Sequence, residues 1–163
     1  MNTTLRSALA AAGTAVLTGT AVLAGGAAPA LAGPTYTYDV TVRTGDRENA
    51  GTSAGVFLTL YGDDDRSAEI RLDNEGHDDF ERGQTDRFRV RTPVRLGRLL
   101  TVRIRHDDRG KKPGWYLEHI RVDRAGEDND ARFAFHRWLA RGQADNAICL
   151  LQHRRPGEPT PCP

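Results

Sequence analysis

The sequence predicts an all-β fold, an antiparallel eight-stranded β-sandwich. Apolar and polar residues alternate through most of the chain after residue 32, and no stretch keeps a helical period for three turns. The alternating segments are short and are separated by turns rich in glycine, aspartate and proline. Short strands at this spacing, without helices between them, are typical of a sandwich.

The first expected strand covers 36–45, where two tyrosines and two valines share one face. In the segment WYLEHIRVD the apolar positions change parity between Glu118 and His119, which predicts a β-bulge. Trp115 and Trp138 fall within the alternating patterns, so we expect both in the core. The other expected strands cover 55–62, 67–73, 86–92, 100–107, 115–123, 131–138 and 146–152.

The first part of the chain has the pattern of a secretory signal peptide. MNTTLR carries one basic residue, and the apolar, alanine-rich run after it ends in Ala30-Leu31-Ala32. An uncleaved membrane anchor is the alternative, because the run is nearly long enough to cross a bilayer. The glycines, threonines and A-x-A ending favour cleavage after Ala32 and a secreted, monomeric protein. The expected organisation is a signal peptide over 1–32, one sandwich domain over 33–152 and a proline-rich tail over 153–163.

Charge argues against a nucleic-acid partner. Of the 23 basic residues only Arg6 lies in the expected signal peptide, so 22 basic residues balance the 22 acidic residues. Bulk attraction to polyanions is therefore not expected, and binding must come from local patches. The two cysteines, Cys149 and Cys162, predict a disulfide that closes the tail in an oxidising compartment.

Several segments in order resemble the PLAT domain, named for polycystin, lipoxygenase and alpha-toxin. They are YDVTVRTGDRENAGTSAGVFLTLYG, DFERGQTDRFRV, LGRLLTVRIRHDDRGKKPGWYLEHIRV and FAFHRWL, which together span about 35–152. The resemblance implies a sandwich of two four-stranded sheets. It also implies a stand-alone, non-catalytic module that binds lipid head groups, membranes or a protein partner through its end loops.

The resemblance to lipoxygenase relatives further implies a calcium site. By position, the backbone of Gly51 and Thr52 and the carboxylates of Asp78, Asp79 and Glu81 are the implied ligands, with Asp107 or Asp108 from a third loop. Calcium suits this set because it takes six to eight oxygen ligands. Two positions depart from the relatives, since Ser53 and Gly114 stand where acids are common. Asp46 of the first loop is the candidate to compensate for these missing acids.

A simpler interpretation of the acidic loop needs no ion. In that case Asp78 and Asp79 are exposed turn residues, and Glu81 pairs with Arg82 to brace the loop over Phe80, which plugs the end of the core. Both interpretations remain open from sequence.

Two basic features predict binding surfaces. Arg109, Lys111 and Lys112 lie in a loop without an exposed aromatic residue, which favours contact with anionic head groups over deep insertion. Arginines also alternate along two strands, and these strands would form one arginine-bearing face if they paired. That face is the alternative site, for a metal-independent protein-binding or inhibitory module. The arginines concerned are Arg87, Arg89, Arg91, Arg103 and Arg105, with Asp39, Glu69 and Glu118 as candidates to interleave with them.

The sequence does not predict an enzyme. His106 beside Asp107 has the residue types of a hydrolase triad, but no G-x-S-x-G motif is present. The five histidines have no H-E-x-x-H or similar zinc spacing. We expect His106 to hydrogen-bond a neighbouring loop.

Overall fold

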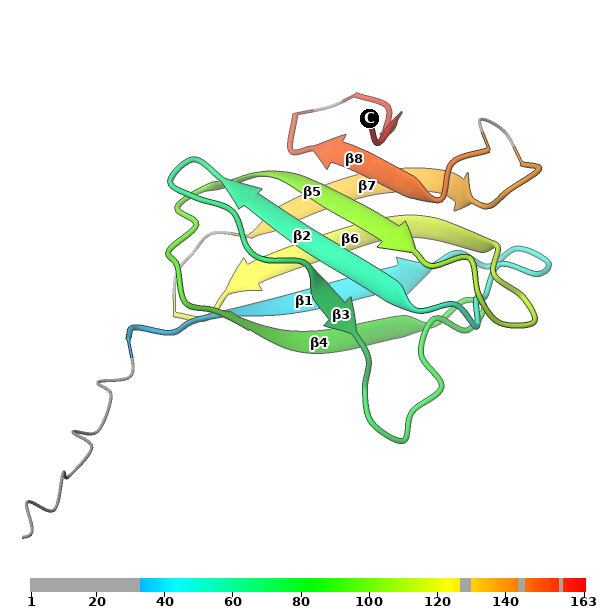
Figure 1. Ribbon diagram of the computed structural model, residues 1–163, viewed down its shortest axis with the longest axis horizontal. Helices are drawn as coiled ribbons and strands as arrows, with labels where there is room; N and C mark the ends of the chain where they lie inside the picture. The colour runs from blue at the N-terminus through cyan, green and yellow to red at the C-terminus, as the bar shows by residue number, and fades with distance from the viewer. Residues whose placement is uncertain (1–32, 127–129, 144–145, 156) are drawn as a thin grey trace, which may run out of the picture. The chain divides into compact units, whose positions relative to one another are not determined.

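Two antiparallel sheets pack face to face in the computed structural model, which describes residues 33–126, 130–143, 146–155 and 157–163 (Figure 1). The expected signal peptide lies outside the described residues. Within the ranges described, the chain has no helix with the length and apolar character needed to cross a membrane.

The first sheet has four strands in the order β4-β1-β6-β7. They are β1 (Tyr36–Thr44), β4 (Thr85–Thr92), β6 (Trp115–Arg124) and β7 (Ala131–Leu139). The second sheet has the order β3-β2-β5-β8-β9. Its strands are β2 (Val56–Gly62), β3 (Ile70–Leu72), β5 (Leu99–His106), β8 (Cys149–His153) and β9 (Thr160–Pro161).

The predicted sandwich is confirmed, but its strand count was wrong. The structure has nine strands in the described ranges, and the second sheet has five strands instead of four. The additional strand, β9, lies in the tail and pairs with β8 through Leu150 opposite Pro161 and Leu151 opposite Thr160. A strand that contains proline is restricted to a sheet edge because proline has no N–H to donate.

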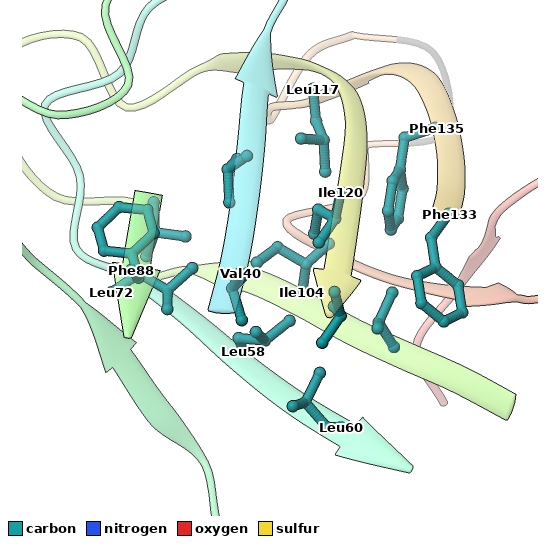
Figure 2. Close-up of a cluster of buried hydrophobic side chains, with 14 of the residues drawn as sticks. Val40, Leu58, Leu60, Leu72, Phe88, Ile104, Leu117, Ile120, Phe133 and Phe135 are labelled. Atoms are coloured by element: carbon teal, nitrogen blue, oxygen red, sulfur yellow. The ribbon is translucent and has the colours of Figure 1, made fainter. Parts of the chain in front are cut away.

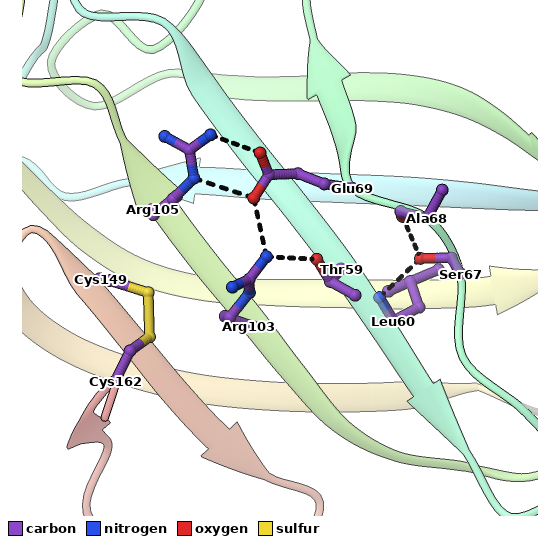
Figure 3. A network of polar contacts seen from close by, with 9 residues as sticks. All are labelled: Thr59, Leu60, Ser67, Ala68, Glu69, Arg103, Arg105, Cys149 and Cys162. Atoms are coloured by element: carbon purple, nitrogen blue, oxygen red, sulfur yellow. Dashed lines mark hydrogen bonds and ion pairs between the residues drawn. A yellow bond between two sulfur atoms is a disulfide. The ribbon is translucent and has the colours of Figure 1, made fainter.

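The predicted disulfide between Cys149 and Cys162 is present and holds β9 against β8 (Figure 3). The N–H of Cys162 also donates to the carbonyl of Cys149 over 3.1 Å. The tail is thus fastened both covalently and through the backbone.

The alternating pattern of the sequence sets the core between the sheets. In β4, buried and exposed residues alternate without exception, and the buried ones face the second sheet. Side chains from both sheets meet in this layer, as Val40, Leu58, Ile104 and Ile120 do in Figure 2. Burying apolar surface in this way supplies the main favourable term in folding.

Of the two tryptophans, only one lies in the core. Trp115 is fully buried, and its indole N–H donates to the Thr44 hydroxyl over 2.9 Å. Trp138 is half-buried on the outer side of the first sheet, edge-on to Tyr116 with ring centroids 5.4 Å apart. The expectation of a core position was therefore wrong for Trp138, because the strand alternates differently after a bulge.

The predicted bulge is confirmed at Glu118. Between β1 and β6, Arg43 pairs with His119, but the next residue of β1, Thr44, pairs with Leu117. Glu118 is therefore an additional residue in β6. β7 has an additional residue of its own beside this bulge, because Leu117 pairs with Arg137 but His119 pairs with Ala134. His136, which lies in this interval, has a φ of 47°. The two bulges re-aim the side chains near the end of the sheet.

Candidate functional site

Three loops meet at the end of the sandwich where β2 begins and β5 ends. They are the loop before β2 (45–55), the loop before β4 (73–84) and the loop after β5 (107–114). Backbone hydrogen bonds join them directly. These run from Thr52 N–H to Phe80 O (3.3 Å), from Gly83 N–H to Gly45 O (3.1 Å) and from Ser53 N–H to Lys112 O (3.0 Å).

The loop before β4 is anchored by Phe80. Its ring is 4 % exposed and packs against Phe88 and Trp115, with centroid separations of 5.5 and 5.3 Å. The expected plug at the end of the core is therefore present. Phe80 has a φ of 65°, in a region that aromatic residues rarely occupy, and this turn directs its N–H inward to the Asp86 carboxylate.

Three of the implied calcium ligands lie around one small hollow. A Cβ added to Gly51 would be 3.3 Å from the Cα of Glu81, so the two loops are in backbone contact. The hollow has a volume of about 190 Å³. It contains one carboxylate and two cationic side chains. Its lining residues are Asn49, Gly51, Thr52, Ser53, Glu81, Arg82 and Lys112.

The other three implied ligands lie elsewhere. Asp79 is buried, and its two oxygens accept hydrogen bonds from the backbone and side-chain amides of Asn74, at 2.7 and 2.8 Å. Asp107 caps its own loop, because its Oδ1 accepts from the N–H groups of Gly55 and Arg109. Asp78 is exposed. The structure therefore does not gather the six residues at one point.

The ion-free interpretation of this loop was wrong in two details. Asp79 is buried, not an exposed turn residue. Arg82 pairs with Asp46 of the neighbouring loop at 2.6 Å, not with Glu81. The Asp46 carboxylate is therefore engaged in an ion pair that joins the two loops.

The buried side of the same loop holds a cluster that the sequence analysis did not identify. One ring nitrogen of His77 and one oxygen each of Asp79 and Asp86 lie within 4.8 Å of one another. The Asp86 side chain is fully buried at the start of β4. Burial raises the pKa of Asp86, and the nearby negative charge of Asp79 raises it further, while the hydrogen bond from the Phe80 N–H acts in the opposite direction.

A sequence signal for Asp86 existed. It shares its parity with the inward-facing Phe88 and Val90, so an acid occupies a core-facing position of an alternating strand. Buried acids are rare unless paired. An acid at a core-facing position of a strand is therefore a candidate functional residue.

The basic loop is presented at the outer edge of this end. Arg109, Lys111 and Lys112 are exposed, and in the ranges described their side chains form no ion pair. Ser53 holds this loop in place, since it donates its N–H to the Lys112 carbonyl and accepts the Lys112 N–H at its hydroxyl, both over 3.0 Å. Ser53, which stands where acids are common in the relatives, thus links two loops.

Comparison with known proteins gives the family. A model described as "PLAT/LH2 domain" matches residues 38–151. The chain belongs to the PLAT/LH2 domain family. Lipoxygenase homology domain-containing protein 1 from Mus musculus is 41% identical over 114 residues, which are 69% of this chain and 6% of that protein. Polycystin-1 from Homo sapiens is 37% identical over 105 residues, 64% of this chain and 2% of its own length. This chain therefore spans only a small part of these relatives.

Solved structures agree with this assignment. A coral 8R-lipoxygenase, described as calcium-activated through a C2-like domain, matches with a TM-score of 0.64 and 26% identity. The match covers 72% of this chain and 16% of the lipoxygenase. The alpha toxin of Clostridium absonum shares the fold, with a TM-score of 0.56 and 18% identity over 79% of this chain and 33% of the toxin.

In this PLAT domain His106 has a structural position. It is fully buried, its Nε2 donates to the Leu139 carbonyl over 3.0 Å, and its Nδ1 accepts the Asp108 N–H over 3.0 Å. Burial is the main cause that lowers its pKa. The expected loop contact is confirmed, and both ring nitrogens are occupied by it.

The arginine-bearing strands of the PLAT domain do not form one face. β4 belongs to the first sheet and β5 to the second, so the predicted single ladder was wrong. Local alternation shows which side chains point outward but not which strands pair. Two of the expected interleaving acids are confirmed: Asp39 bonds Arg89 at 2.9 Å, and Glu69 bonds both Arg103 and Arg105 (Figure 3). Glu118 instead lies 3.8 Å from Arg43, which is not one of the five arginines.

Proposed function

We propose that this PLAT domain is a non-catalytic binding module that attaches to anionic lipid head groups through the basic loop at one end. The observation that carries the proposal is the exposure of Arg109, Lys111 and Lys112 without acidic partners in the described structure. Most other arginines of the domain whose contacts are described are paired with acids. Three unpaired cations on one braced loop therefore form the strongest local positive patch at this end.

The contact would be superficial. The basic loop has no exposed aromatic residue, and Leu100 is the one large apolar side chain that is well exposed in the ranges described. Each basic residue near an anionic surface contributes about 1 kcal/mol, so three contribute about 3 kcal/mol. This gives reversible attachment that weakens as salt rises.

Calcium is proposed as a cofactor of this attachment. Glu81 lines the hollow together with Gly51, Thr52 and Lys112. One carboxylate cannot satisfy an ion that takes six to eight oxygens, so phosphate oxygens of the head group and water would complete its shell. The calcium activation described for the coral 8R-lipoxygenase supports this proposal. An affinity of about 0.1 to 1 mM is expected for a site with so few carboxylates.

Secretion and a monomeric state complete the proposal. The disulfide suits an oxidising compartment, and the proposed signal peptide would direct the chain there. The near absence of large apolar side chains from the described surface argues against an extensive apolar interface.

Vesicle co-sedimentation tests the proposal. We expect the purified protein to pellet with phosphatidylserine-containing vesicles at low salt but not with pure phosphatidylcholine vesicles. The variant Arg109→Glu, Lys111→Glu, Lys112→Glu should lose about 100-fold or more in affinity. The matched control is Arg66→Glu, Arg95→Glu, Arg98→Glu at the opposite end of the sandwich, which should bind normally. Equal losses in both variants would overturn the proposal, as would equal binding to neutral vesicles.

The calcium step has its own variant. Millimolar calcium should strengthen vesicle binding by the wild-type protein, and Glu81→Gln should remove that gain without affecting calcium-free binding. A calcium gain that survives in Glu81→Gln would show that the hollow is not the site.

A second candidate function is metal-independent binding of an acidic protein on the outer face of the first sheet. The observation that favours it is a surface hollow of about 740 Å³ along β4, β1 and β6. Its charged lining consists of Arg87, Arg89, Arg121, His119, Asp39 and Asp123. This candidate predicts that Arg87→Glu reduces partner binding while vesicle binding is unchanged.

A further inference from the structure

We propose that His77, Asp79 and Asp86 form a binding site for a divalent transition-metal ion of the zinc class. The three side chains each offer one donor atom, and all three atoms lie within 4.8 Å of one another. The site is separate from the proposed calcium position at Glu81, because none of its three residues lines the hollow beside Gly51.

The strongest indication is the state of the Asp86 carboxylate. Its Oδ2 accepts the Phe80 N–H over 2.9 Å, whereas its Oδ1 has no hydrogen-bond partner among the described atoms. The side chain is 0 % exposed. A buried acceptor without a partner costs about 1 to 3 kcal/mol, and more when charged. A cation at Oδ1 would remove this cost.

His77 is placed to offer its Nε2 to a metal. The Glu81 N–H donates to the Gln84 Oε1 over 3.3 Å, which orients the Gln84 side chain. Its amide nitrogen then lies 3.1 Å from His77 Nε2 and donates to it. Nε2 uses its one lone pair to accept this bond, so a metal ion at Nε2 would take the place of the Gln84 N–H. The separation of 3.9 Å from Asp86 Oδ1 is too long for a hydrogen bond between the two side chains.

The outer contacts of the cluster hold the ligands in place. Asn74 binds both oxygens of Asp79, and its backbone carbonyl accepts the backbone N–H of His77 over 3.0 Å. Hydrogen bonds of this kind orient metal ligands and are a regular part of metal sites. The Asp79 oxygens retain further acceptor capacity, since a carboxylate has about four lone-pair positions.

The donor set selects the metal. One imidazole nitrogen and two carboxylates suit zinc and its neighbours, whereas calcium takes oxygen ligands alone. Two bonds of about 2.1 Å allow donor atoms to be at most about 4.2 Å apart. The His77 side chain is 52 % exposed, and a turn of its ring away from Gln84 toward the two acids would close the remaining gap. Three protein ligands leave a fourth position for water or for a donor from a partner.

Thermal unfolding with added metal tests the site. We expect zinc at about ten times its dissociation constant to stabilise the purified protein by about 1.4 kcal/mol, which raises the melting temperature by several degrees. His77→Ala should abolish the shift, because it removes an exposed ligand without disturbing the core. Cobalt should give the visible absorption of a nitrogen- and oxygen-bound ion in the wild-type protein and none in His77→Ala.

Two matched variants control for adventitious binding. His153→Ala removes a histidine at the opposite end, and Asp78→Asn removes the neighbouring exposed acid. Both should keep the zinc shift. The proposal is overturned if wild-type protein shows no zinc shift, or if the shift survives in His77→Ala. Calcium separates this site from the proposed function, since Glu81→Gln should remove a calcium response and leave the zinc response intact.

Discussion

The backbone N–H of Phe80 donates to Oδ2 of Asp86 over 2.9 Å, and this bond connects the end of the core to the start of β4. Phe80 reaches this geometry only with a positive φ, which costs about 1 to 3 kcal/mol for a residue other than glycine. Burial of its ring between Phe88 and Trp115 offsets that cost. One residue thus closes the core and orients the buried acid beside the proposed metal position.

Replacement of Phe80 by alanine should destabilise the domain strongly. Loss of a buried phenylalanine costs about 3 to 5 kcal/mol because a cavity remains. Urea unfolding followed by tryptophan fluorescence measures the loss. Phe57→Ala is the control, since the Phe57 ring lies on the outer face under the Arg105 guanidinium at 4.1 Å and should cost less than about 2 kcal/mol. Equal losses would contradict the assignment of Phe80 to the core.

The fold was predictable because alternation, turns and strand length are local properties of the chain. The eight expected strands all occur. β9 was missed because a strand of two residues, one of them proline, carries no periodic signal. The disulfide and the neighbouring strand, not local preference, place it at the sheet edge.

The site was predictable only in part, because sequence shows which loops converge but not where their side chains point. Loop convergence and the basic loop are as expected. Asp79, however, turns inward to Asn74, and Asp86 completes the cluster from a strand rather than a loop. The prediction of one arginine-bearing face was wrong for a related reason. β4 pairs with β1 instead of β5, and strand pairing is a tertiary property that local alternation does not show.

Removal of the disulfide should lower stability without unfolding the sandwich. The two cysteines are 13 residues apart, and closing a loop of this size contributes about 3 kcal/mol in the chain-entropy account. The Cys149→Ser, Cys162→Ser variant should therefore lose about 3 kcal/mol in urea unfolding. Wild-type protein under reducing conditions should match it, and the variant itself should not respond to reductant. Loss of all cooperative unfolding would show that the tail is required for folding.

Gly62 should not tolerate alanine. A Cβ at this position would lie 1.6 Å from the backbone carbonyl oxygen of Leu96, so the two chain segments would have to separate. Overpacking against backbone that cannot rotate away should cost about 3 kcal/mol or more. Gly157→Ala is the control, because its nearest neighbour, the Arg155 carbonyl, is 4.0 Å away. Similar melting temperatures for the two variants would show that Gly62 and Leu96 are not in close contact.

Glu69 should make the stability of the domain depend on pH. Its hydrogen bonds to Arg105 are the main cause that lowers its pKa, and the charge of Arg103 adds to this. An acid with a lowered pKa in the folded state stabilises the protein above its ordinary pKa, and this contribution disappears as pH falls through the folded value. Glu69→Gln should therefore cost about 1 kcal/mol at neutral pH, a modest figure because the network is partly exposed to solvent.

The difference between wild type and Glu69→Gln should begin to shrink as pH falls below the ordinary pKa of 4.5 and vanish once Glu69 is protonated in the folded state. Urea unfolding at a series of pH values measures it. Glu48→Gln is the control, since Glu48 is exposed and forms no ion pair in the described part of the chain. Its stability should follow the wild type at every pH. A Glu69→Gln deficit that stays constant down to pH values well below 4.5 would show that the charge of Glu69 does not explain the loss.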